Sequence, residues 1–399
     1  MKECLLGAWD VIVIGAGVMG TSVAWNLAAL GCRCVLVLER GQIGSGTTSQ
    51  SSGILRTHYS VPQNIELAQR SWSVFERFAE HLEDEDASAG LVRCGYLIAA
   101  PQGPKLEPLR AALASQQARG IEVKLLSAQD ATQYLPIARF DDAALIGFEP
   151  DAGFADAYLV ATNYARAARR LGVQFREGVS VEDLWVRNDR VQGVRTAQGQ
   201  ETAPCVISTQ NIWTHELAQW TGIRVPLIAE RHRVIALQGP QDYTYRMPVY
   251  KDLGSPGMLY CRSYGGRQML VSEGTAGQTL ATPDNEQGDV PMEYVAQVGE
   301  QVAQRFASFA QAGLVSAWTG VYDVTPDWNP VLGSIPEVAG LVVGFGFSGH
   351  GFKLSPAVGR VLAQQALGLT TDIDLATYAL ERFRSGKLLQ GRYGQGAVS

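Results

Sequence analysis

Apolar runs of two kinds divide the chain into predicted elements. Residues 11–14 and 34–38 are continuous runs of mainly β-branched and aliphatic side chains, typical of strands buried on both faces of a parallel sheet. Residues 65–82 instead carry apolar side chains on one face of a helix. The order strand, helix, strand at the start of the chain predicts an α/β fold.

Weaker patterns predict the remaining elements. Further strands are expected at residues 91–100, 121–126, 173–175, 179–196, 205–209 and 341–343, with a turn at Asn188-Asp189. Further helices are expected at residues 21–30, 106–119, 158–171 and within 290–311. Residues 135–150 are expected to be irregular, and residues 227–280 to be rich in strands. A last helix is expected to run to about Leu367, with Ser355 as its N-cap and Pro356 at its first position.

Composition narrows the class of protein. The 399 residues exceed the ~250–300 at which single hydrophobic cores stop growing, so two domains are expected. A net charge of −6, without a block of Lys or Arg, argues against nucleic acid or anionic lipid as partners. The six cysteines include no C-x-x-C pair, and the five histidines include no pair four residues apart. We therefore expect reduced thiols in a cytoplasmic protein, without a disulfide framework and without a metal site.

The apolar stretch at residues 4–30 does not read as a targeting segment. Asp10 and several glycines interrupt it, and it lacks a cationic start and an A-x-A cleavage site. Neither a signal peptide nor a membrane span is therefore expected.

A glycine-rich turn follows the first strand. Gly15, Gly17 and Gly20 have the G-x-G-x-x-G spacing, which allows a tight turn, close approach of a pyrophosphate to the backbone, and close packing of the helix. The second strand ends in Glu39, near the offset at which an acidic side chain accepts a hydrogen bond from a ribose 2′-OH. Together these features predict an adenine dinucleotide site. NADP is the least favoured ligand, because Glu39 disfavours a 2′-phosphate.

Two further stretches fit such a site. Residues 41–53 are small or carry hydroxyls, so they form either a flexible surface loop or a loop that lines a pyrophosphate and reaches an isoalloxazine. Residues 344–353 form a second glycine-rich turn between a strand and a helix. We expect the N-terminus of that helix to face the N1–C2=O edge of a flavin, where it would stabilise the charge of the reduced ring.

The chain resembles a known family through four stretches that occur in order. These stretches are G-A-G-V-M-G (15–20), G-T-T-S-Q-S-S-G-I-L-R-T-H-Y (46–59), V-Y-D-V-T-P-D (321–327) and G-F-S-G-H-G-F-K-L-S-P (346–356). The family is that of FAD-dependent amine and amino-acid oxidoreductases, which includes monomeric sarcosine oxidase, the sarcosine oxidase β subunit, dimethylglycine dehydrogenase, glycine oxidase and D-amino acid dehydrogenases. The resemblance extends from about Asp10 to about Leu367.

This resemblance implies a two-part architecture. A Rossmann-like FAD-binding domain would be assembled from residues 1–90, 150–222 and 315–399. A mixed-sheet, β-rich substrate domain would be inserted as residues 91–149 and 223–314.

The resemblance also implies which residues hold the FAD. They are Gly15, Ala16, Gly17, Val18 and Met19 at the pyrophosphate, Glu39 and Arg40 at the ribose, Val181 at the adenine, Gly46, Thr47, Thr48, Ser52, Gly53 and Ile54 along the flavin, and Gly346, Gly349, Gly351, Phe352 and Lys353 at its pyrimidine edge.

Three residues are candidates for catalysis. Arg56 and Lys353 match the cations that grip the substrate carboxylate in sarcosine oxidase. The alternatives are a structural arginine and a lysine that only caps the flavin. His350 is either a catalytic residue or a buried, hydrogen-bonded histidine at a crowded turn.

The sequence also departs from the family at three positions. Relatives that attach their flavin through cysteine carry it where this chain has Gly320, and those that use histidine carry it where this chain has Ser49-Gln50. Noncovalent FAD is therefore expected. The lysine that activates oxygen in monomeric sarcosine oxidase is replaced by Leu270, which leaves the choice between oxidase and dehydrogenase open.

The implied reaction is oxidation of the C–N bond of a small N-methyl, D- or cyclic amino acid to an imine, by hydride transfer to flavin N5. Oxygen or an electron carrier would be the acceptor, and a partner subunit is not excluded. Two alternatives stay open, namely flavin-dependent oxidation of a 2-hydroxy acid and a flavin-containing assembly protein without turnover.

Overall fold

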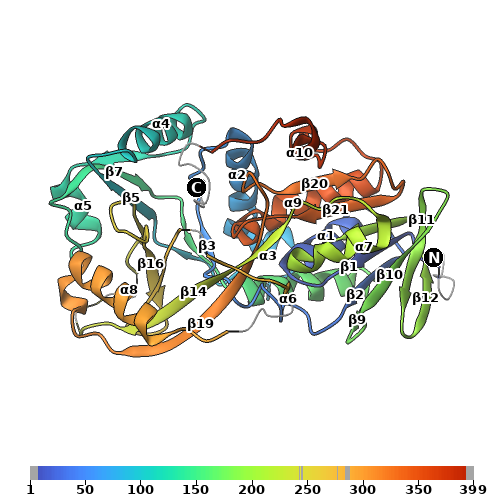
Figure 1. Ribbon diagram of the computed structural model, residues 1–399, viewed down its shortest axis with the longest axis horizontal. Coiled ribbons are helices and arrows are strands. Elements are labelled where there is room, and N and C mark those ends of the chain that lie inside the picture. Colours follow the sequence, from blue (N-terminus) through green and yellow to red (C-terminus); the bar gives the residue numbers. More distant parts are fainter. Residues whose placement is uncertain (1–7, 242, 244–245, 276, 284–287, 392–399) are drawn as a thin grey trace.

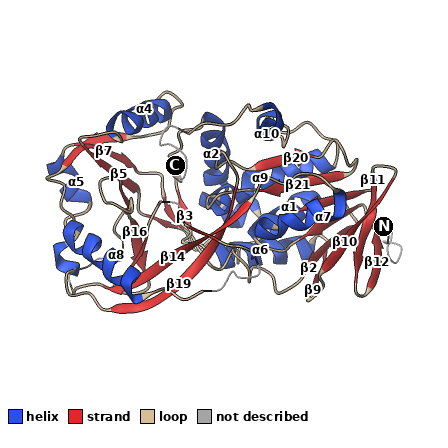
Figure 2. Cartoon of the chain, viewed as in Figure 1, coloured by secondary structure: helices blue, strands red, loops and turns tan. Residues whose placement is uncertain are grey.

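The computed structural model describes residues 8–241, 243, 246–275, 277–283 and 288–391. Figure 1 shows two parts side by side, one around α1 and α9 and the other around α5 and α8, with the long strands β14 and β19 running between them. Figure 2 shows that both parts combine helices and strands. The predicted α/β fold with a β-rich second part is confirmed.

The helices have the following bounds. They are α1 (Val18–Ala29), α2 (Pro62–Glu76), α3 (Phe78–His81), α4 (Leu106–Gln117), α5 (Ala128–Tyr134), α6 (Ala157–Arg170), α7 (His215–Thr221), α8 (Met292–Arg305), α9 (Gly351–Ala366) and α10 (Arg382–Ser385), with 3₁₀ turns η1 (Asn211–Thr214), η3 (Ala307–Phe309) and η4 (Ala376–Tyr378).

A six-stranded sheet forms the core of the first part. Its strands, in spatial order, are β20 (Val331–Ser334), β21 (Leu341–Phe345), β13 (Cys205–Ser208), β1 (Val11–Ile14), β2 (Val35–Glu39) and β9 (Gln174–Glu177). All neighbours are parallel except β20, which is antiparallel to β21.

Both faces of this sheet are covered. Val11 and Val13 of β1 face a core shared with α1, α6 and α9, whereas Ile12 and Ile14 face a second core. The three-stranded sheet β10 (Val181–Arg187), β11 (Arg190–Thr196) and β12 (Gly199–Thr202) contributes to that second core. The continuous apolar strands of the sequence are therefore buried on both sides, as predicted.

A larger sheet of nine strands forms the second part. Its strands are β18 (Gln278–Thr279), β14 (Ile228–Gln238), β17 (Gln268–Ser272), β16 (Tyr260–Tyr264), β15 (Val249–Asp252), β5 (Tyr96–Pro101), β7 (Ala143–Glu149) and β6 (Lys124–Leu126) in spatial order, with β19 (Leu314–Val324) paired to β14. A small sheet of β3 (Ile54–Leu55), β8 (Gly153–Phe154) and β4 (Val92–Arg93) completes the strands. The nine-stranded sheet thus extends to residue 324, beyond the boundary expected at residue 315, and the division into domains stays a prediction.

Helices α1 and α9 cross at very close range. The Ser22 hydroxyl of α1 donates to the carbonyl of Ser355, and a Cβ on Gly359 would lie 2.1 Å from the Ser22 Oγ. No larger residue than glycine therefore fits at this crossing without displacing its neighbour.

The prediction that Ser355 caps the last helix was wrong. Helix α9 begins at Gly351, with His350 as its N-cap, and Pro356 lies inside it. Proline cannot donate to the Phe352 carbonyl four residues earlier. The Ser355 hydroxyl donates to that carbonyl instead, at 2.8 Å, which lets the helix continue through the proline.

Two other elements differ from expectation. Residues 135–150, expected to be irregular, contain β7, because pairing with β5 and β6 stabilises a strand that Gly147 obscures in the sequence. A Cβ on Gly147 would lie 2.7 Å from Leu113 Cδ2 of α4, so this glycine allows the helix to approach the sheet. The helix expected at residues 65–82 is interrupted at Arg77, which leaves the helical region.

The cysteines also correct an expectation. Cys32, Cys94, Cys205 and Cys261 are free, but Cys34 is disulfide-bonded. Sequence spacing did not reveal this, because a disulfide requires cysteines that are close in space. Cys4 lies outside the described residues. None of the helices in the described part of the chain has the length and apolarity needed to cross a membrane.

Candidate functional site

Three adjoining cavities lead from the first part of the molecule to the nine-stranded sheet of the second. The first and second share Gly17, Thr47 and Thr48 in their walls, and the second and third share Ser52 and Gly349. A continuous path therefore leads from the carboxyl end of β2 to the face of the nine-stranded sheet. Its length and its two glycine-rich ends suit an extended ligand.

The first cavity lies where the dinucleotide motif predicts an adenosine. Glu39, Arg40 and Val181 line it, as do Thr209 and Trp213, which the sequence did not indicate. The Arg40 guanidinium stacks over the Trp213 ring, 3.5 Å from its centroid.

Glu39 organises the turn around this cavity. One carboxylate oxygen accepts from the N–H of Ala16 and the other from the N–H of Gly41, both at 2.7 Å. Ala16 is buried and holds the turn through its backbone, since it does not line the three cavities. The acid thus fixes the two backbone segments that border the predicted ribose site.

The glycines act as their spacing predicts. Gly15 has φ +95°, and a Cβ on Gly20 would lie 1.9 Å from the carbonyl oxygen of Gly15, so the third glycine lets helix α1 pack on the turn. The Thr48 hydroxyl accepts from the N–H of Val18, the first residue of α1. Gly17, Val18 and Met19 then line the second cavity at the start of the helix.

The second cavity lies between the N-termini of α1 and α9. Gly349, Gly351 and Phe352 line it, together with Asp323 and Tyr322 at the end of β19. The Asp323 carboxylate accepts from the N–H of Gly346 at 2.6 Å and of Phe347 at 3.1 Å. Burial raises the pKa of Asp323 to about 7, although these N–H groups act to lower it.

Besides Ala16, two of the predicted FAD residues support the turns instead of lining the cavities. Gly346 has φ +74°, and a Cβ there would lie 2.2 Å from Thr325 Cγ2. Gly53 has φ +69°, and a Cβ there would lie 2.1 Å from the carbonyl oxygen of Ala155. Gly46 borders the first cavity and Ile54 the third. Their contacts with FAD stay predictions.

The third cavity brings together the two predicted substrate cations. Arg56 follows β3, and Lys353 lies in the first turn of α9, so they are about 300 residues apart in sequence but line one cavity. Both side chains are buried, with exposed fractions of 6% and 8%. Burial and the neighbouring Arg56 guanidinium hold the pKa of Lys353 well below its usual range. The Tyr59 ring lies beside both cations. Its centroid is 4.9 Å from Arg56 Cζ and 6.0 Å from Lys353 Nζ.

A buried polar network supports the segment around Arg56. The Glu149 carboxylate accepts from the N–H and the hydroxyl of Thr57, both at 2.7 Å, and from Gln116 Nε2. His58 Nδ1 contacts the Gln116 oxygen at 2.7 Å. Burial, followed by the Arg56 charge, lowers the pKa of His58 to about 3, so this histidine is neutral. The network fixes the backbone on which Arg56 is carried.

His350 lies next to the site but outside the walls of the three cavities. Its Nε2 contacts the Trp328 carbonyl at 2.9 Å, and its ring packs edge-on against Tyr59. Burial and the Lys353 charge lower the pKa of His350 to about 3. Its catalytic role stays a prediction, and its contacts are those of a neutral, supporting histidine.

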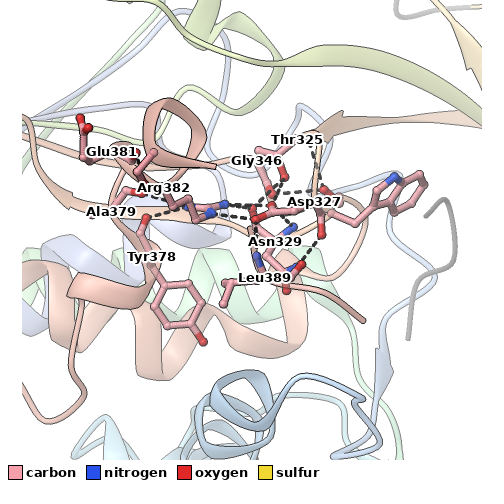
Figure 3. Close-up of polar contacts among 12 residues, drawn as sticks. Thr325, Asp327, Asn329, Gly346, Tyr378, Ala379, Glu381, Arg382 and Leu389 are labelled. Atoms are coloured by element: carbon pink, nitrogen blue, oxygen red, sulfur yellow. Dashed lines mark hydrogen bonds and ion pairs between the residues drawn. The ribbon is translucent and has the colours of Figure 1, made fainter. Parts of the chain in front are cut away.

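The turn after β19 carries the Trp328 carbonyl that contacts His350. The C-terminal segment anchors this turn through Asp327 and Asn329 (Figure 3). Arg382 binds Asp327 through two hydrogen bonds of 2.8 and 3.0 Å and donates to the Asn329 carbonyl at 2.7 Å. Both charged side chains are almost completely buried. The N–H of Leu389 also donates to Asp327, so the segment from α10 onward is fixed to the turn after β19.

Several residues of the site could not be identified from the sequence. His232, Lys251, Tyr260 and Glu273 come from the nine-stranded sheet or its connections, and all line the third cavity. They lie in a β-rich stretch without a distinctive motif. Only Tyr322 carried a signal, because it belongs to the V-Y-D-V-T-P-D stretch that the sequence had singled out.

The two positions at which relatives attach their flavin, Gly320 and Gln50 in this chain, lie next to each other in the structure. The Gln50 side-chain oxygen accepts from the N–H of Val321, and a Cβ on Gly320 would lie 3.4 Å from Gln50 Cβ. Gln50 and Gly320 both line the second cavity. Neither has a side chain that bonds to a flavin carbon in the way cysteine or histidine does.

These features fit an FAD molecule. Glu39 and the turn at Gly15 border the first cavity, and the start of α1 lies where the first cavity meets the second. The glycine-rich turn at the start of α9 borders the opposite end of the second cavity. Helix N-termini and glycine turns without Cβ atoms are suited to a pyrophosphate and to the anionic edge of a reduced flavin.

Comparisons with known proteins agree with this assignment. The family model described as "FAD dependent oxidoreductase" matches residues 10–365. The chain is 27% identical to 4-methylaminobutanoate oxidase (formaldehyde-forming) of Paenarthrobacter nicotinovorans over 93% of its length and 45% of that protein. It is 27% identical to human mitochondrial sarcosine dehydrogenase over 94% of its length and 41% of that protein. The chain therefore spans less than half the length of these relatives.

A third relative and two solved structures are similar over nearly their whole length. Sarcosine oxidase subunit beta of an Arthrobacter species is 25% identical, with 98% of this chain and 95% of that protein covered. L-proline dehydrogenase from P. horikoshii has a TM-score of 0.87 and 24% identity, with coverage of 96% and 99%. Glycine oxidase from Geobacillus kaustophilus has a TM-score of 0.82 and 24% identity, with coverage of 94% and 99%. These two structures share the fold, and the family match covers most of the chain, so the protein belongs to the family of FAD-dependent oxidoreductases.

Proposed function

We propose that this protein oxidises the C–N bond of a small amino acid, which is N-methylated, of D configuration or cyclic, to an imine that water then hydrolyses. The observation that carries the proposal is that Arg56 and Lys353 line a cavity that adjoins the cavity between α1 and α9. The names of the relatives, which include an oxidase of 4-methylaminobutanoate and a sarcosine dehydrogenase, support an amine or amino-acid substrate.

The two cations orient the substrate. Arg56 presents a planar fork of N–H donors that suits a carboxylate, and Lys353 adds a point charge. The pKa of Lys353 is held low by burial and by Arg56, so a bound carboxylate favours its charged form. The grip on the carboxylate fixes the direction in which the neighbouring C–H bond points.

The remaining chemistry is divided between cofactor and chain. The Gly15 and Gly349 turns and Glu39 would hold FAD, which, when bound, would supply the acceptor for the hydride equivalent that leaves the substrate carbon. The chain limits the access of water to the reacting carbon, because the buried Tyr96 and the half-buried Tyr322 both wall the third cavity. An amine that enters neutral needs no strong base, so the reaction makes little demand on acid–base residues.

We further propose that the FAD is noncovalent, on the basis of Gln50 and Gly320. Acid precipitation should then release all the flavin into the supernatant. Oxygen or an electron carrier is the acceptor, and a partner subunit is compatible with the similarity to sarcosine oxidase subunit beta.

The decisive experiment is reduction of the bound flavin in the absence of oxygen. N-methyl, D- and cyclic amino acids and 2-hydroxy acids are added to the purified protein, and the flavin absorbance is followed. Bleaching by amino acids supports the proposal, bleaching by hydroxy acids alone replaces the substrate class, and no bleaching by any compound contradicts catalysis of this kind.

Variants of Arg56 test the substrate grip. Removal of one partner from a buried, hydrogen-bonded charge pair costs ~2–5 kcal/mol, so Arg56→Ala should lower the efficiency of flavin reduction by ~30-fold or more. Arg56→Lys should recover part of it, and FAD content should remain unchanged. Arg110→Ala, an exposed arginine of α4, is the control. Wild-type efficiency in Arg56→Ala would remove Arg56 from the site.

A further inference from the structure

The third cavity contains a cation that the proposed grip does not use. Lys251 lies on β15, where side chains alternate between the two faces of the sheet. Val249 and Lys251 face one side, and Tyr250 and Asp252 face the other, where Asp252 binds Arg305 at 2.9 Å. Asp252, next to Lys251 in sequence, is thus paired with Arg305, and its charge is the smallest of the effects on the pKa of Lys251.

Lys251 is buried against apolar and aromatic atoms. Its exposed fraction is 7%, and its Nζ lies 5.5 Å from the centroid of the Tyr260 ring, directly across the strand pair. A Cβ on Gly274 would lie 1.8 Å from the same Nζ, so the ammonium rests on this glycine. Across the described part of the chain, no hydrogen bond or ion pair reaches the Lys251 ammonium.

The walls of the cavity carry an excess of positive charge. Arg56, Lys251 and Lys353 line it, and Glu273 is the acidic residue in the same lining. Glu273 lies over Gly257 and accepts from Gln301 at 3.1 Å. One substrate carboxylate gripped by Arg56 and Lys353 would therefore leave Lys251 without an anionic partner.

A buried ammonium is stable only when it is paired or loses its proton. Burial, with the charges of Arg56 and Lys105, lowers the pKa of Lys251 to about 7. The contact with Tyr260 compensates in part, since a cation–π contact contributes ~0.5–2 kcal/mol. An anion in the cavity would compensate for the rest.

We propose that the substrate carries a second carboxylate and that Lys251 binds it, while Arg56 and Lys353 bind the first. The substrate class is then an amino acid with an acidic side chain, or one whose nitrogen carries a carboxyalkyl group. This inference rests on the proposed function for the identity of the first carboxylate and of the amine.

Binding of unreactive acids tests Lys251 without turnover. Succinate and glutarate are titrated into the FAD-loaded protein beside butyrate and valerate, which have the same numbers of carbon atoms but one carboxylate each. Calorimetry and the perturbation of the flavin spectrum give the dissociation constants. We expect the dicarboxylates to bind at least ~10-fold more tightly, and equal or weaker binding would overturn the proposal.

Reduction of the flavin tests the substrate class. N-methylaspartate is compared with N-methylalanine, N-(carboxymethyl)glycine with N-methylglycine, and D-glutamate with D-alanine, without oxygen. The dicarboxylic member of at least one pair should reduce the flavin ~30-fold more efficiently. Preference for the monocarboxylic member in all pairs would overturn the inference but leave the proposed function intact. If no amine bleaches the flavin, the proposed function fails, and the acid titrations still decide whether Lys251 binds a second carboxylate.

Three variants identify the residue responsible. Lys251→Met keeps most of the length of the side chain, removes its charge and should abolish the preference for dicarboxylates. Gly274→Ala retains the charge but displaces the ammonium, and should reduce the preference in part. Lys105→Met removes a charge that acts on Lys251 from outside the cavity walls, and should leave the preference within ~3-fold. A Lys251→Met protein that still prefers dicarboxylates would overturn the assignment.

Discussion

Single side chains fix the backbone around the FAD site. Glu39 accepts from the N–H groups of Ala16 and Gly41, and Asp323 accepts from those of Gly346 and Phe347. Each acid thus holds one of the two glycine-rich turns. In both places the position of a carboxylate decides where backbone N–H groups point.

Glu39→Ala should weaken FAD binding without unfolding the protein. Hydrogen bonds to a charged group contribute ~1.5–3 kcal/mol each, so the dissociation constant should rise by at least about 10-fold. Fluorescence titration of the apoprotein with FAD measures it. Glu177→Ala is the matched control, because Glu177 pairs with Glu39 in the sheet register and binds the N–H of Ile43 without lining the cavity. Equal losses in both variants would contradict a specific role for Glu39.

The site residues that could be predicted from the sequence all lie in recognisable motifs. Gly15, Glu39, Arg56 and Lys353 belong to stretches whose spacing or resemblance indicates a function. Lys251 belongs to an ordinary strand, and its position in the site depends on the register between β15 and its neighbours. The pairing with β5 joins residues more than 150 apart in sequence, which local patterns do not encode.

At the level of elements, the turn after β19 stabilises the start of α9. Asp323 is buried at the end of β19, just before this turn, and its pKa of about 7 lies above its ordinary value. Between about pH 4 and pH 7 the folded protein therefore keeps a proton that the unfolded chain has released. This group makes the free energy of unfolding fall as the pH rises through that window.

Asp323→Asn should remove this part of the pH dependence. The amide stays neutral, so the stability difference between wild type and variant should change with pH between about 4 and 7 and become constant only about one pH unit or more above the folded-state pKa of about 7. Urea unfolding of the FAD-free proteins at several pH values measures it. A constant difference across the whole range would show that Asp323 is charged in the folded state throughout.

The C-terminal segment offers a direct comparison of a buried arginine, Arg382 (Figure 3), with an exposed one, Arg384. Arg382→Met leaves the Asp327 carboxylate buried without its cation, which should cost about 3–5 kcal/mol. Arg384→Met removes exposed ion pairs with Glu337 and Glu381 and should cost less than ~1 kcal/mol. Urea unfolding of both variants checks this, and similar losses would mean that the buried pair adds no stability.

Elements were predicted well where periodicity decides and poorly where tertiary contacts decide. The hairpin of β10 and β11 was expected at Asn188-Asp189, and both residues have positive φ, as a tight hairpin turn requires. The start of α9 was misplaced because Pro356 reads as a first helical residue. The hydroxyl of Ser355, which lets the helix pass through the proline, has no signature in sequence.

At the scale of the whole molecule, the site lies between two sheets. On one side, its walls come from α1, α9 and the loop of residues 41–53. On the other side, they come from β14, β15 and β16. A ligand that fills the three cavities contacts both parts of the molecule. Because these contacts exist only when both parts are folded, the ligand binds the folded chain and not the unfolded one. The α/β fold could be predicted from sequence, whereas the sheet that contains β19 could not, because pairing with β14 joins strands about 90 residues apart.

FAD should therefore stabilise both parts together. Binding at 100 times the dissociation constant adds about 2.7 kcal/mol to the free energy of unfolding, which raises the Tm by several degrees. Thermal unfolding followed by far-ultraviolet circular dichroism, with and without added FAD, measures it. A transition in which only part of the signal shifts would show that the two parts unfold independently.

The close crossing of α1 and α9 bears on how such an enzyme acquires new substrates. Ser22, Ser355 and Gly359 leave no space at the crossing, so the two helix N-termini that border the cofactor path are held at a fixed spacing. The opposite wall consists of strand side chains that alternate along β15 and β16 and can be exchanged one at a time. Substitutions in the nine-stranded sheet can thus change which molecule is oxidised. The N-termini of α1 and α9, which border the proposed cofactor site, keep their positions while this happens.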